Sequence, residues 1–305
     1  MTKTNNSNTT KGSLMLLTTA IIWGLAFIAQ RKGMDHLGEF TFSSVRCILA
    51  GICLLPVMKL MRSKENVAVK KDENPKDVIW GGFFCGLALF LGMAFQQLGI
   101  SRTSIANSGF ISALYIIIVP IIGLFFHKKV SSNIWIGVAL SIVGLALMCF
   151  EGSIKMQSGD IIMIVSALFY SCHIMVIDHF ASKVDGLKMS CIQFFVAGIL
   201  NGICMFIFET PTISNILQAW VPILYVAFLS TAMGYTFQIF AQKYVSSTIA
   251  SLILSLESVF AALFGWLILH ETMSFQKFCG CALVFSAVIL AQLPTGKLFK
   301  KKIKE

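Results

Sequence analysis

The chain has 305 residues, of which 56% are hydrophobic and only 12% are charged, and its mean hydropathy is +0.81. A soluble domain carries about 25% charged residues, so this composition excludes an ordinary soluble fold. The net charge of +10 does not indicate nucleic-acid binding, because the basic residues lie between apolar stretches and at the chain ends.

Ten apolar stretches of roughly 18–23 residues fill the chain in two sets of five. A helix of about 20 apolar residues spans the hydrocarbon core of a bilayer, where every backbone polar group must bond within its own segment. The sequence therefore predicts an all-α integral membrane protein. The ten helices are predicted at 12–30, 40–61, 78–98, 103–126, 133–150, 159–179, 189–208, 219–241, 247–269 and 276–294.

Polar segments divide the chain into five parts. The N-terminal part is rich in Asn, Thr and Ser and is expected to be disordered, and the C-terminal part is basic. The predicted parts are a polar N-terminus, a first five-helix repeat, a linker, a second five-helix repeat and a tail, at residues 1–11, 12–150, 151–158, 159–294 and 295–305.

The distribution of Lys and Arg predicts the topology. With the N-terminus inside, 18 basic residues fall on the inner side and 5 on the outer side. Cytoplasmic loops are enriched in Lys and Arg, so both termini are predicted in the cytoplasm of a cell-membrane protein. Because five is odd, the second set of helices enters from the opposite side, which makes two inverted repeats, an architecture of secondary transporters.

The two halves also match in sequence, which indicates internal duplication. Trp23 aligns with Tyr170 at an offset of 147, residues 105–106 with 249–250 at 144, and His127 with His270 at 143. In addition, Gly82–Gly86 and Gly198–Gly202 have the GxxxG spacing that lets membrane helices touch, although such spacing also arises by chance in an apolar chain.

Four stretches carry a resemblance to a known family. They are AIIWGLAFI (20–28), FSSVRCILAGICLLP (42–56), SGFISALYIIIVPIIGLFF (108–126) and SLILSLESVFAALFGWLILHET (251–272). In this order they resemble helices one, two, four and nine of the EamA-type branch of the drug/metabolite transporter superfamily. The resemblance implies a ten-helix carrier that moves a small organic metabolite, such as an amino acid or a drug, by alternating access. It also implies a central substrate cavity between the repeats and favours export.

The chain departs from the family pattern at two places. The ninth helix of the family commonly reads Glu-Pro, whereas Glu257 is followed here by Ser258, so a kink is not assured. An acidic residue is common after the fourth helix, and Lys128 stands in its place. Pro120 lies within the predicted fourth helix, where it can kink the helix or only shape the bundle.

Ionisable residues within the spans are the main functional candidates, because a charge at membrane depth costs about 2.5–3.5 kcal/mol or more. Glu257 is predicted near the midplane, either as a proton-coupling carboxylate or ligand for a substrate amine, or as a buried acid bonded to hydroxyl groups. Arg46 can snorkel to the interface, hold a substrate carboxylate, or pair with Glu257. His173 is a candidate proton relay or a structural histidine.

Uncharged polar and aromatic side chains complete the predicted cavity, although interhelical hydrogen bonds are the alternative role for each polar one. Gln96 and Gln238 are favoured because they occupy similar places in the two repeats. Trp23 and Tyr170 are repeat equivalents that lie too deep for an interfacial belt. The remaining candidates are Asn107, Tyr115, Gln193 and Tyr235.

No nucleotide-binding, metalloprotease or serine-hydrolase motif occurs in the sequence. We therefore predict no enzyme activity, no cofactor and no metal, with an ion gradient, exchange or the substrate's own gradient as the driving force. The expected partners are a small-molecule substrate and the lipid bilayer, not nucleic acid, and a homodimer is one possible assembly. The alternative is an integral membrane enzyme or lipid-handling protein without solute flux.

Overall fold

A computed structural model describes residues 3–64, 73–103, 105–128, 130–149, 157–270 and 272–292, and these residues form helices and connecting turns without strands. Within this part of the chain, nine helical segments are long and apolar enough to cross a membrane, and the shorter apolar helix Ser132–Met148 stands where the fifth span was predicted. The ten-helix all-α fold is thereby confirmed, with the fifth span shorter than predicted.

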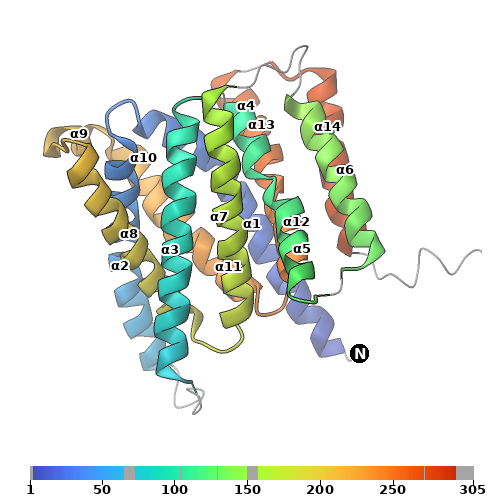
Figure 1. Ribbon diagram of the computed structural model, residues 1–305, viewed down its shortest axis with the longest axis horizontal. Helices are drawn as coiled ribbons and strands as arrows, with labels where there is room; N and C mark the ends of the chain where they lie inside the picture. The colour runs from blue at the N-terminus through green and yellow to red at the C-terminus, as the bar shows by residue number, and fades with distance from the viewer. Residues whose placement is uncertain are drawn as a thin grey trace, which may run out of the picture.

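The first half contains α1 to α6 and the second half contains α7 to α14 (Figure 1). The helices of the first half are α1 (Lys3–Gly33), α2 (Glu39–Lys64), α3 (Pro75–Ile100), α4 (Ile105–Ser112), α5 (Tyr115–Phe125) and α6 (Ser132–Cys149). Those of the second half are α7 (Ser158–Phe180), α8 (Gly186–Phe208), α9 (Ile213–Gln218), α10 (Trp220–Leu224), the π-helix η1 (Tyr225–Tyr235), α11 (Thr236–Ala241), α12 (Ser247–Leu254), α13 (Leu256–Leu269) and α14 (Phe275–Gln292).

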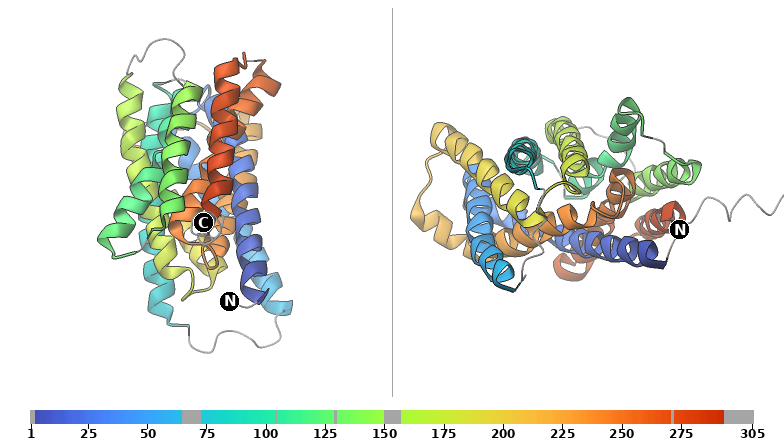
Figure 2. Two further views of the ribbon diagram at one scale, coloured as in Figure 1. Left: turned by 90° about the vertical axis from the view of Figure 1, so that its right-hand side faces the viewer. Right: turned by 90° about the horizontal axis from the view of Figure 1, so that it is seen from below.

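The two halves run through the bundle in opposite directions. In Figure 1, α1 rises from the N-terminus at the bottom, whereas α7, the first helix of the second half, descends from the top. The two further views in Figure 2 show the same long, roughly parallel bundle from the side and from below. This is the inverted-repeat arrangement that the sequence predicts.

A residue with left-handed backbone stands at the end of one helix in each half, His127 just after the α5 cap Phe126 and His270 as the cap of α13. His127 and His270 have φ of 56° and 55°, and they are the non-glycine residues with positive φ in the described chain. This shared left-handed conformation confirms the offset of 143 at the ends of α5 and α13. Nearer the middle of the same spans, α4 and α12 end at Ser112 and Leu254, which differ by 142, whereas the sequence predicts an offset of 144 near residue 105.

Both predicted GxxxG pairs are helix contacts. A Cβ on Gly82 would lie 2.5 Å from Ile192, and one on Gly86 would lie 2.6 Å from Val196, so α3 packs closely on α8. Gly198 meets α2 in the same way. Such spacings leave no room for a side chain, and they bring the two repeats into contact through small residues.

The start of α1 corrects one prediction. The polar segment 1–11 was expected to be disordered, but α1 begins at Lys3. The cost of a helix lies in its nucleation, so extending an apolar helix that already exists is much easier than starting a new one. Contact with the second repeat also contributes, because a Cβ on Gly12 would lie 2.8 Å from Val245.

Candidate functional site

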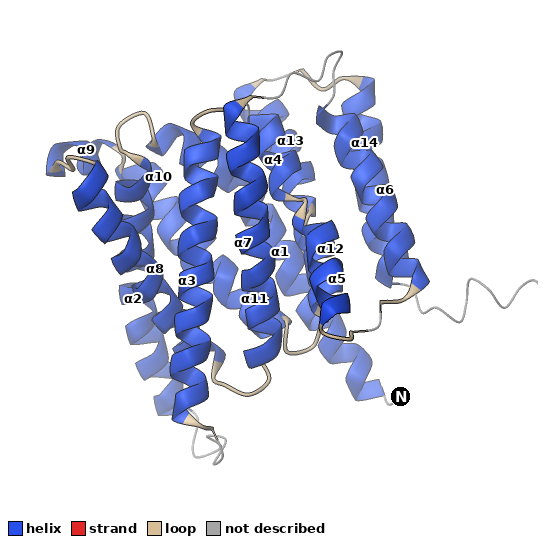
Figure 3. Cartoon of the chain, viewed as in Figure 1, coloured by secondary structure: helices blue, strands red, loops and turns tan. Residues whose placement is uncertain are grey.

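The fourth and ninth membrane helices are both interrupted near their middles. The interruption between α4 and α5 includes Leu114, with φ −59° and ψ −14°, and the one between α12 and α13 is Ser255, with φ −60° and ψ −15°. These angles and the Ile116 N to Ala113 O and Ser258 N to Ser255 O bonds are those of a tight 3₁₀ turn. Figure 3 shows the break between α4 and α5 as a short tan segment.

Proline does not cause either interruption. Pro120 lies inside α5, beyond the break, and Ser258 occupies the place where the family commonly has proline. The doubtful kink next to Glu257 is therefore present without a proline. Discontinuous helices at the midplane are a common way for transporters to free backbone groups beside a substrate site.

The two interrupted helices are joined at their breaks. The Tyr115 hydroxyl donates a 3.0 Å hydrogen bond to Glu257 Oε1, and the Ser258 hydroxyl donates a 2.6 Å bond to the Gly109 carbonyl. Tyr115 is the first residue of α5 and Glu257 is the second residue of α13, so the two occupy corresponding places just after the breaks of the two repeats. The only intramembrane acid among the predicted candidates thus lies at the pseudo-symmetric centre.

A small cavity lies beside this junction. Its volume is about 30 Å³, enough for about two water molecules. It is lined by Trp23, Ala26, Phe27, Gln30, Arg46, Gln96, Ser112, Tyr115, Tyr170, His173, Ile174, Ser230, Tyr235, Gln238, Leu254 and Glu257.

The lining is largely built from repeat equivalents. Residues 23, 26 and 27 on α1 correspond to 170, 173 and 174 on α7 at the offset of 147, and all six line the cavity. Residues 96, 112 and 115 correspond to 238, 254 and 257 at the offset of 142. The cavity therefore lies on the pseudo-two-fold axis between the repeats.

Arg46 is the cation of the cavity. Its side chain is only 2% exposed, which excludes the snorkelling alternative. Nη1 donates to Gln30 Oε1 at 3.2 Å and the guanidinium lies 5.6 Å from the Phe42 ring centroid, but Nε and Nη2 have no hydrogen-bond partner among the described residues. Neither Arg46 nor Glu257 has an ion-pair partner within 4.0 Å in this part of the chain, so the predicted pair between them is absent.

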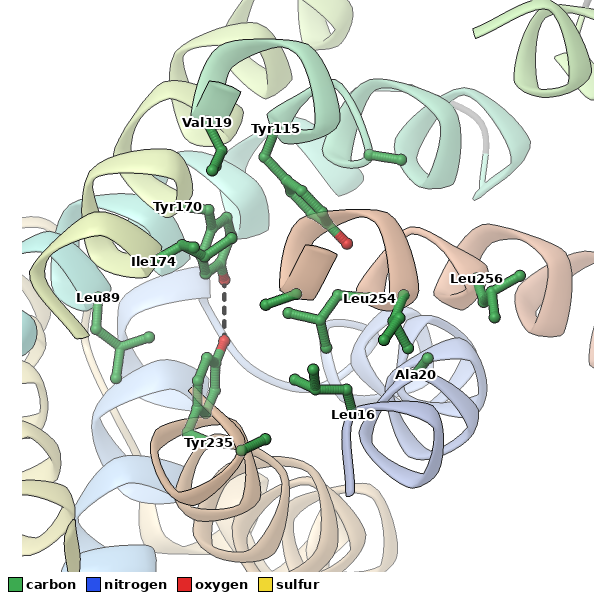
Figure 4. Close-up of a cluster of buried hydrophobic side chains, with 14 of the residues drawn as sticks. Leu16, Ala20, Leu89, Tyr115, Val119, Tyr170, Ile174, Tyr235, Leu254 and Leu256 are labelled. Carbon is green, nitrogen blue, oxygen red and sulfur yellow. Dashed lines mark hydrogen bonds between the residues drawn. The ribbon is translucent and has the colours of Figure 1, made fainter. Parts of the chain in front are cut away.

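Hydroxyl and amide groups form a chain across the cavity. Tyr235 donates to the Tyr170 hydroxyl at 3.4 Å, drawn in Figure 4, and Tyr170 donates to Gln96 Oε1 at 2.9 Å. Gln96 Nε2 in turn lies 3.3 Å from the Ser112 hydroxyl. The chain links helices of both repeats and fixes the orientation of the Tyr170 ring.

Trp23 is held by the π-helix η1. Its indole Nε1 donates to the Ser230 carbonyl at 3.0 Å, and its ring lies 4.7 Å from that of Tyr235. A Cβ on Gly234 would lie 2.6 Å from the indole nitrogen, so this position admits only glycine without rearrangement. A π-helix inside a membrane helix is rare and often marks a functional site.

The remaining predicted residues have different positions. His173 lines the cavity and its Nε2 lies 3.0 Å from Gln193 Oε1, while Gln193 itself is fully buried behind it and does not line the cavity. Gln238 donates to Gln242 Oε1 at 3.1 Å. The side chain of Asn107 lies outside the described residues.

Gln30, Ser112 and Ser230 line the cavity but were not predicted. A helical face gives the signal for Gln30, because residues 23, 26, 27 and 30 follow the i, i+3, i+4, i+7 spacing on α1. Ser230 could not be found in this way, because the π-helix changes the angular spacing of its neighbours.

Comparisons with known proteins agree with this architecture. The model of the EamA-like transporter family matches residues 10–150 and 157–293. A protein of Archaeoglobus fulgidus named an uncharacterized transporter is 31% identical over 281 residues, which cover 92% of this chain and 85% of that protein. The Escherichia coli K12 protein named uncharacterized inner membrane transporter YedA is 22% identical, and the match covers 91% of this chain and 89% of that protein.

A solved structure also shares the fold. It is 15% identical, has a TM-score of 0.76, and the match covers 93% of this chain and 96% of the other.

Proposed function

The chain belongs to the EamA-like transporter family, and we propose that it is a secondary transporter that moves a small organic molecule across the cytoplasmic membrane by alternating access. The proposed binding site is the central cavity between the two repeats. We further propose export, with both chain ends in the cytoplasm. The 18-to-5 bias of Lys and Arg supports this orientation, and the resemblance to the family supports the direction.

Arg46 carries the proposal about the substrate. A buried cation without a counter-ion is strongly unfavourable, yet Nε and Nη2 of this residue lack partners and the side chain lines the cavity. A substrate carboxylate, phosphate or sulfonate would supply the missing acceptors, because the guanidinium binds such groups with two parallel hydrogen bonds. We propose that the transported molecule carries an anionic group that contacts Arg46.

Glu257 is the proposed second contact. It is 4% exposed and its described partner is the hydroxyl of Tyr115. An acid at the midplane can release and take up a proton during the cycle, or it can bind an amine of the substrate. Because it lies where the two interrupted helices meet, either event would act on the junction between the repeats.

The proposed cycle requires the cavity to enlarge. A volume of about 30 Å³ holds water, whereas a metabolite needs a pocket of several hundred Å³. Substrate entry therefore requires the repeats to separate on one side, which an alternating-access cycle provides.

Transport by purified protein in proteoliposomes tests this function. Untargeted metabolite profiling of cells with and without the protein first identifies a substrate. Loss of a charged hydrogen bond of about 1.5–3 kcal/mol weakens binding about 10- to 150-fold, so Arg46→Gln is expected to raise the half-saturating concentration by at least tenfold. Arg102→Gln is the matched control, because Arg102 is exposed and its Nη1 contacts the Leu98 carbonyl.

Equal transport by Arg46→Gln and wild-type protein would refute the site. Absence of flux for every profiled metabolite, together with a chemical change in one of them, would favour the alternative of a membrane enzyme.

A further inference from the structure

A group of buried polar side chains lies next to Arg46, toward the end of the bundle where α2 begins. Ser43, Gln97 and Asn201 are all fully buried. Among the described residues, the Ser43 hydroxyl, both amide atoms of Gln97 and Oδ1 of Asn201 have no hydrogen-bond partner. Buried polar groups in proteins are nearly always hydrogen-bonded, because an unpaired one is unfavourable. The group therefore indicates a bound molecule that supplies the missing donors and acceptors.

The helices α2 and α3 are joined at two levels. At the first level the Ser101 hydroxyl donates a 3.0 Å hydrogen bond to Glu39 Oε1, and at the second Cys47 Sγ lies 3.5 Å from Met93 Sδ. The two levels are eight residues apart on each helix, at 39 and 47 on α2 and at 101 and 93 on α3. The two helices therefore run antiparallel and stay in register between these contacts.

Ser43 and Gln97 lie halfway between the two contacts, one on each helix. Each is four residues from the contact residues on either side of it, and residues four apart share one helix face. A third helix reaches the same level, because the Ser44 hydroxyl donates a 2.9 Å hydrogen bond to the Gly198 carbonyl and Asn201 follows on the next turn of α8. Polar side chains of α2, α3 and α8 thus gather at one level of the bundle.

Arg46 joins this level to the central cavity. It lies three residues after Ser43, on the same side of α2, and it lines the cavity with Nε and Nη2 unpaired among the described residues. Positive charge therefore lies at one end of the group, and neutral donors and acceptors lie beyond it. An anion that carries a neutral polar group matches this order, because a second charge would meet only amide and hydroxyl groups.

The other repeat shows that packing does not require these polar side chains. At the offsets of 142 and 147, the equivalents of the two amides are Ile239 and Leu54, which are buried and apolar. The equivalent of the serine is Ser190, whose hydroxyl donates a 2.7 Å hydrogen bond to a backbone carbonyl of its own helix. The same places in the scaffold are therefore filled by apolar or paired side chains in one copy and by unpaired polar ones in the other.

We infer that Ser43, Gln97 and Asn201 form a polar subsite that continues the central cavity toward the start of α2. The subsite binds a neutral hydroxyl or amide group of the molecule whose anionic group contacts Arg46. This inference rests on the proposed function, because the cavity reaches the subsite only when it enlarges. It adds the direction in which the cavity grows and a second chemical group of the substrate.

Thermal unfolding of the full-length, ligand-free protein in detergent tests whether the subsite lacks partners. Leucine has nearly the volume of glutamine, so Gln97→Leu replaces an unpaired amide by an apolar group and is expected to raise the unfolding temperature by about 2 °C or more. Gln242→Leu is the matched control, because this buried amide donates to the Ile174 carbonyl at 2.9 Å and accepts from Gln238. The control is expected to lower the temperature. If Gln97→Leu lowers it too, the Gln97 amide is satisfied within the folded protein and the inference is overturned.

Propionate, lactate and glycerate test the ligand chemistry, because these three-carbon carboxylates carry no, one and two hydroxyl groups. One neutral hydrogen bond strengthens binding about 2- to 12-fold. The concentration that gives half of the thermal stabilisation is therefore expected to be about threefold lower, or less, for glycerate than for propionate, and Gln97→Leu is expected to remove this difference. Equal concentrations for the three probes in the wild-type protein would overturn the subsite.

Arg46→Gln separates the subsite from the proposed function on which it rests. This variant is expected to weaken the binding of all three carboxylates. If it does so while glycerate and propionate bind equally, the anion contact of the proposed function stands and the subsite alone fails. If it changes none of them, or if no carboxylate shifts the unfolding temperature, the anion contact fails and the subsite fails with it.

Discussion

Asp178, near the end of α7, joins three helix ends. In Figure 1 the lower end of α7 lies on the same side of the bundle as the N-terminus. Oδ2 of Asp178 pairs with Nζ of Lys128, just after α5, and its Oδ1 accepts a 3.0 Å hydrogen bond from the backbone N–H of Ser247, the first residue of α12. Ser246, the residue before α12, makes no side-chain cap. The carboxylate of α7 therefore caps α12 from outside while it holds the end of α5.

The two contacts have different expected magnitudes. The side chains of Lys128 and Asp178 are 40% and 17% exposed, so the ion pair contributes about 0.2–1 kcal/mol to stability. Loss of a helix cap costs about 0.5–2 kcal/mol. Asp178→Asn removes the charge but keeps an acceptor for the Ser247 N–H, so it should cost under about 1 kcal/mol. Asp178→Ala removes both contacts and should cost about 1–3 kcal/mol.

Thermal unfolding in detergent separates these contributions. One kcal/mol shifts the unfolding temperature of a chain of this size by about 2 °C. Asp178→Ala is expected to lower it by about 2–6 °C, Asp178→Asn and Lys128→Gln by at most about 2 °C, and the exposed Asp35→Ala not at all. If Asp178→Asn destabilises as much as Asp178→Ala, the capping argument is wrong.

Three further outcomes follow from other contacts. Glu209 accepts two backbone N–H groups at the start of α2, so Glu209→Ala should cost about 1–2 kcal/mol of unfolding free energy, and an unchanged unfolding temperature would contradict this cap. Burial raises the pKa of Glu73, but hydrogen bonds from Lys188 and a backbone N–H outweigh burial and hold the pKa below 4.5. The ionised carboxylate therefore contributes a small stabilisation that is present above pH 4.5 and is lost as the pH falls through the lowered pKa. In Glu73→Gln this pH-dependent contribution should be absent from the acid unfolding profile. A Cβ on Gly280 would lie 2.5 Å from a backbone oxygen of α6, whereas one on Gly123 has at least 3.8 Å, so Gly280→Ala should lose about 1–3 kcal/mol and Gly123→Ala should be neutral in the same thermal assay.

The spans were predictable because the bilayer imposes their length and apolarity on the sequence. The interruptions at Leu114 and Ser255 were not, because a tight 3₁₀ turn within a membrane helix requires no special residue. The one visible signal, Pro120, lies inside a continuous helix. Burial of the backbone among neighbouring helices decides where such a turn is tolerated, and this information is absent from a single apolar segment.

The charged residues of the cavity were predictable from the free-energy cost of a charge at membrane depth. The repeat-related residues were predictable from the sequence offset between the two halves. Arg46 and Glu257 stood out because charge at membrane depth needs an explanation. Their lack of contact with each other could not be predicted, because it depends on how the repeats pack. Gln193 shows the opposite failure: its position is repeat-equivalent to Arg46, yet its amide turns away to His173.

Each charged group of the cavity has an uncharged partner in the other repeat. Arg46 corresponds to Gln193 at the offset of 147, and Glu257 corresponds to Tyr115 at 142. The helices therefore form a nearly symmetric frame, whereas the two charged groups do not repeat. Arg46 occurs only in the first repeat and Glu257 only in the second. Under the proposed function, a substrate that pairs with Arg46 would bind in one orientation only, because the equivalent place in the other repeat holds the neutral amide of Gln193, whose Oε1 contacts His173. Under the proposed function, the duplication would supply the opposed helices that alternating access needs. The differences between the two copies would supply the groups that distinguish one end of a substrate from the other.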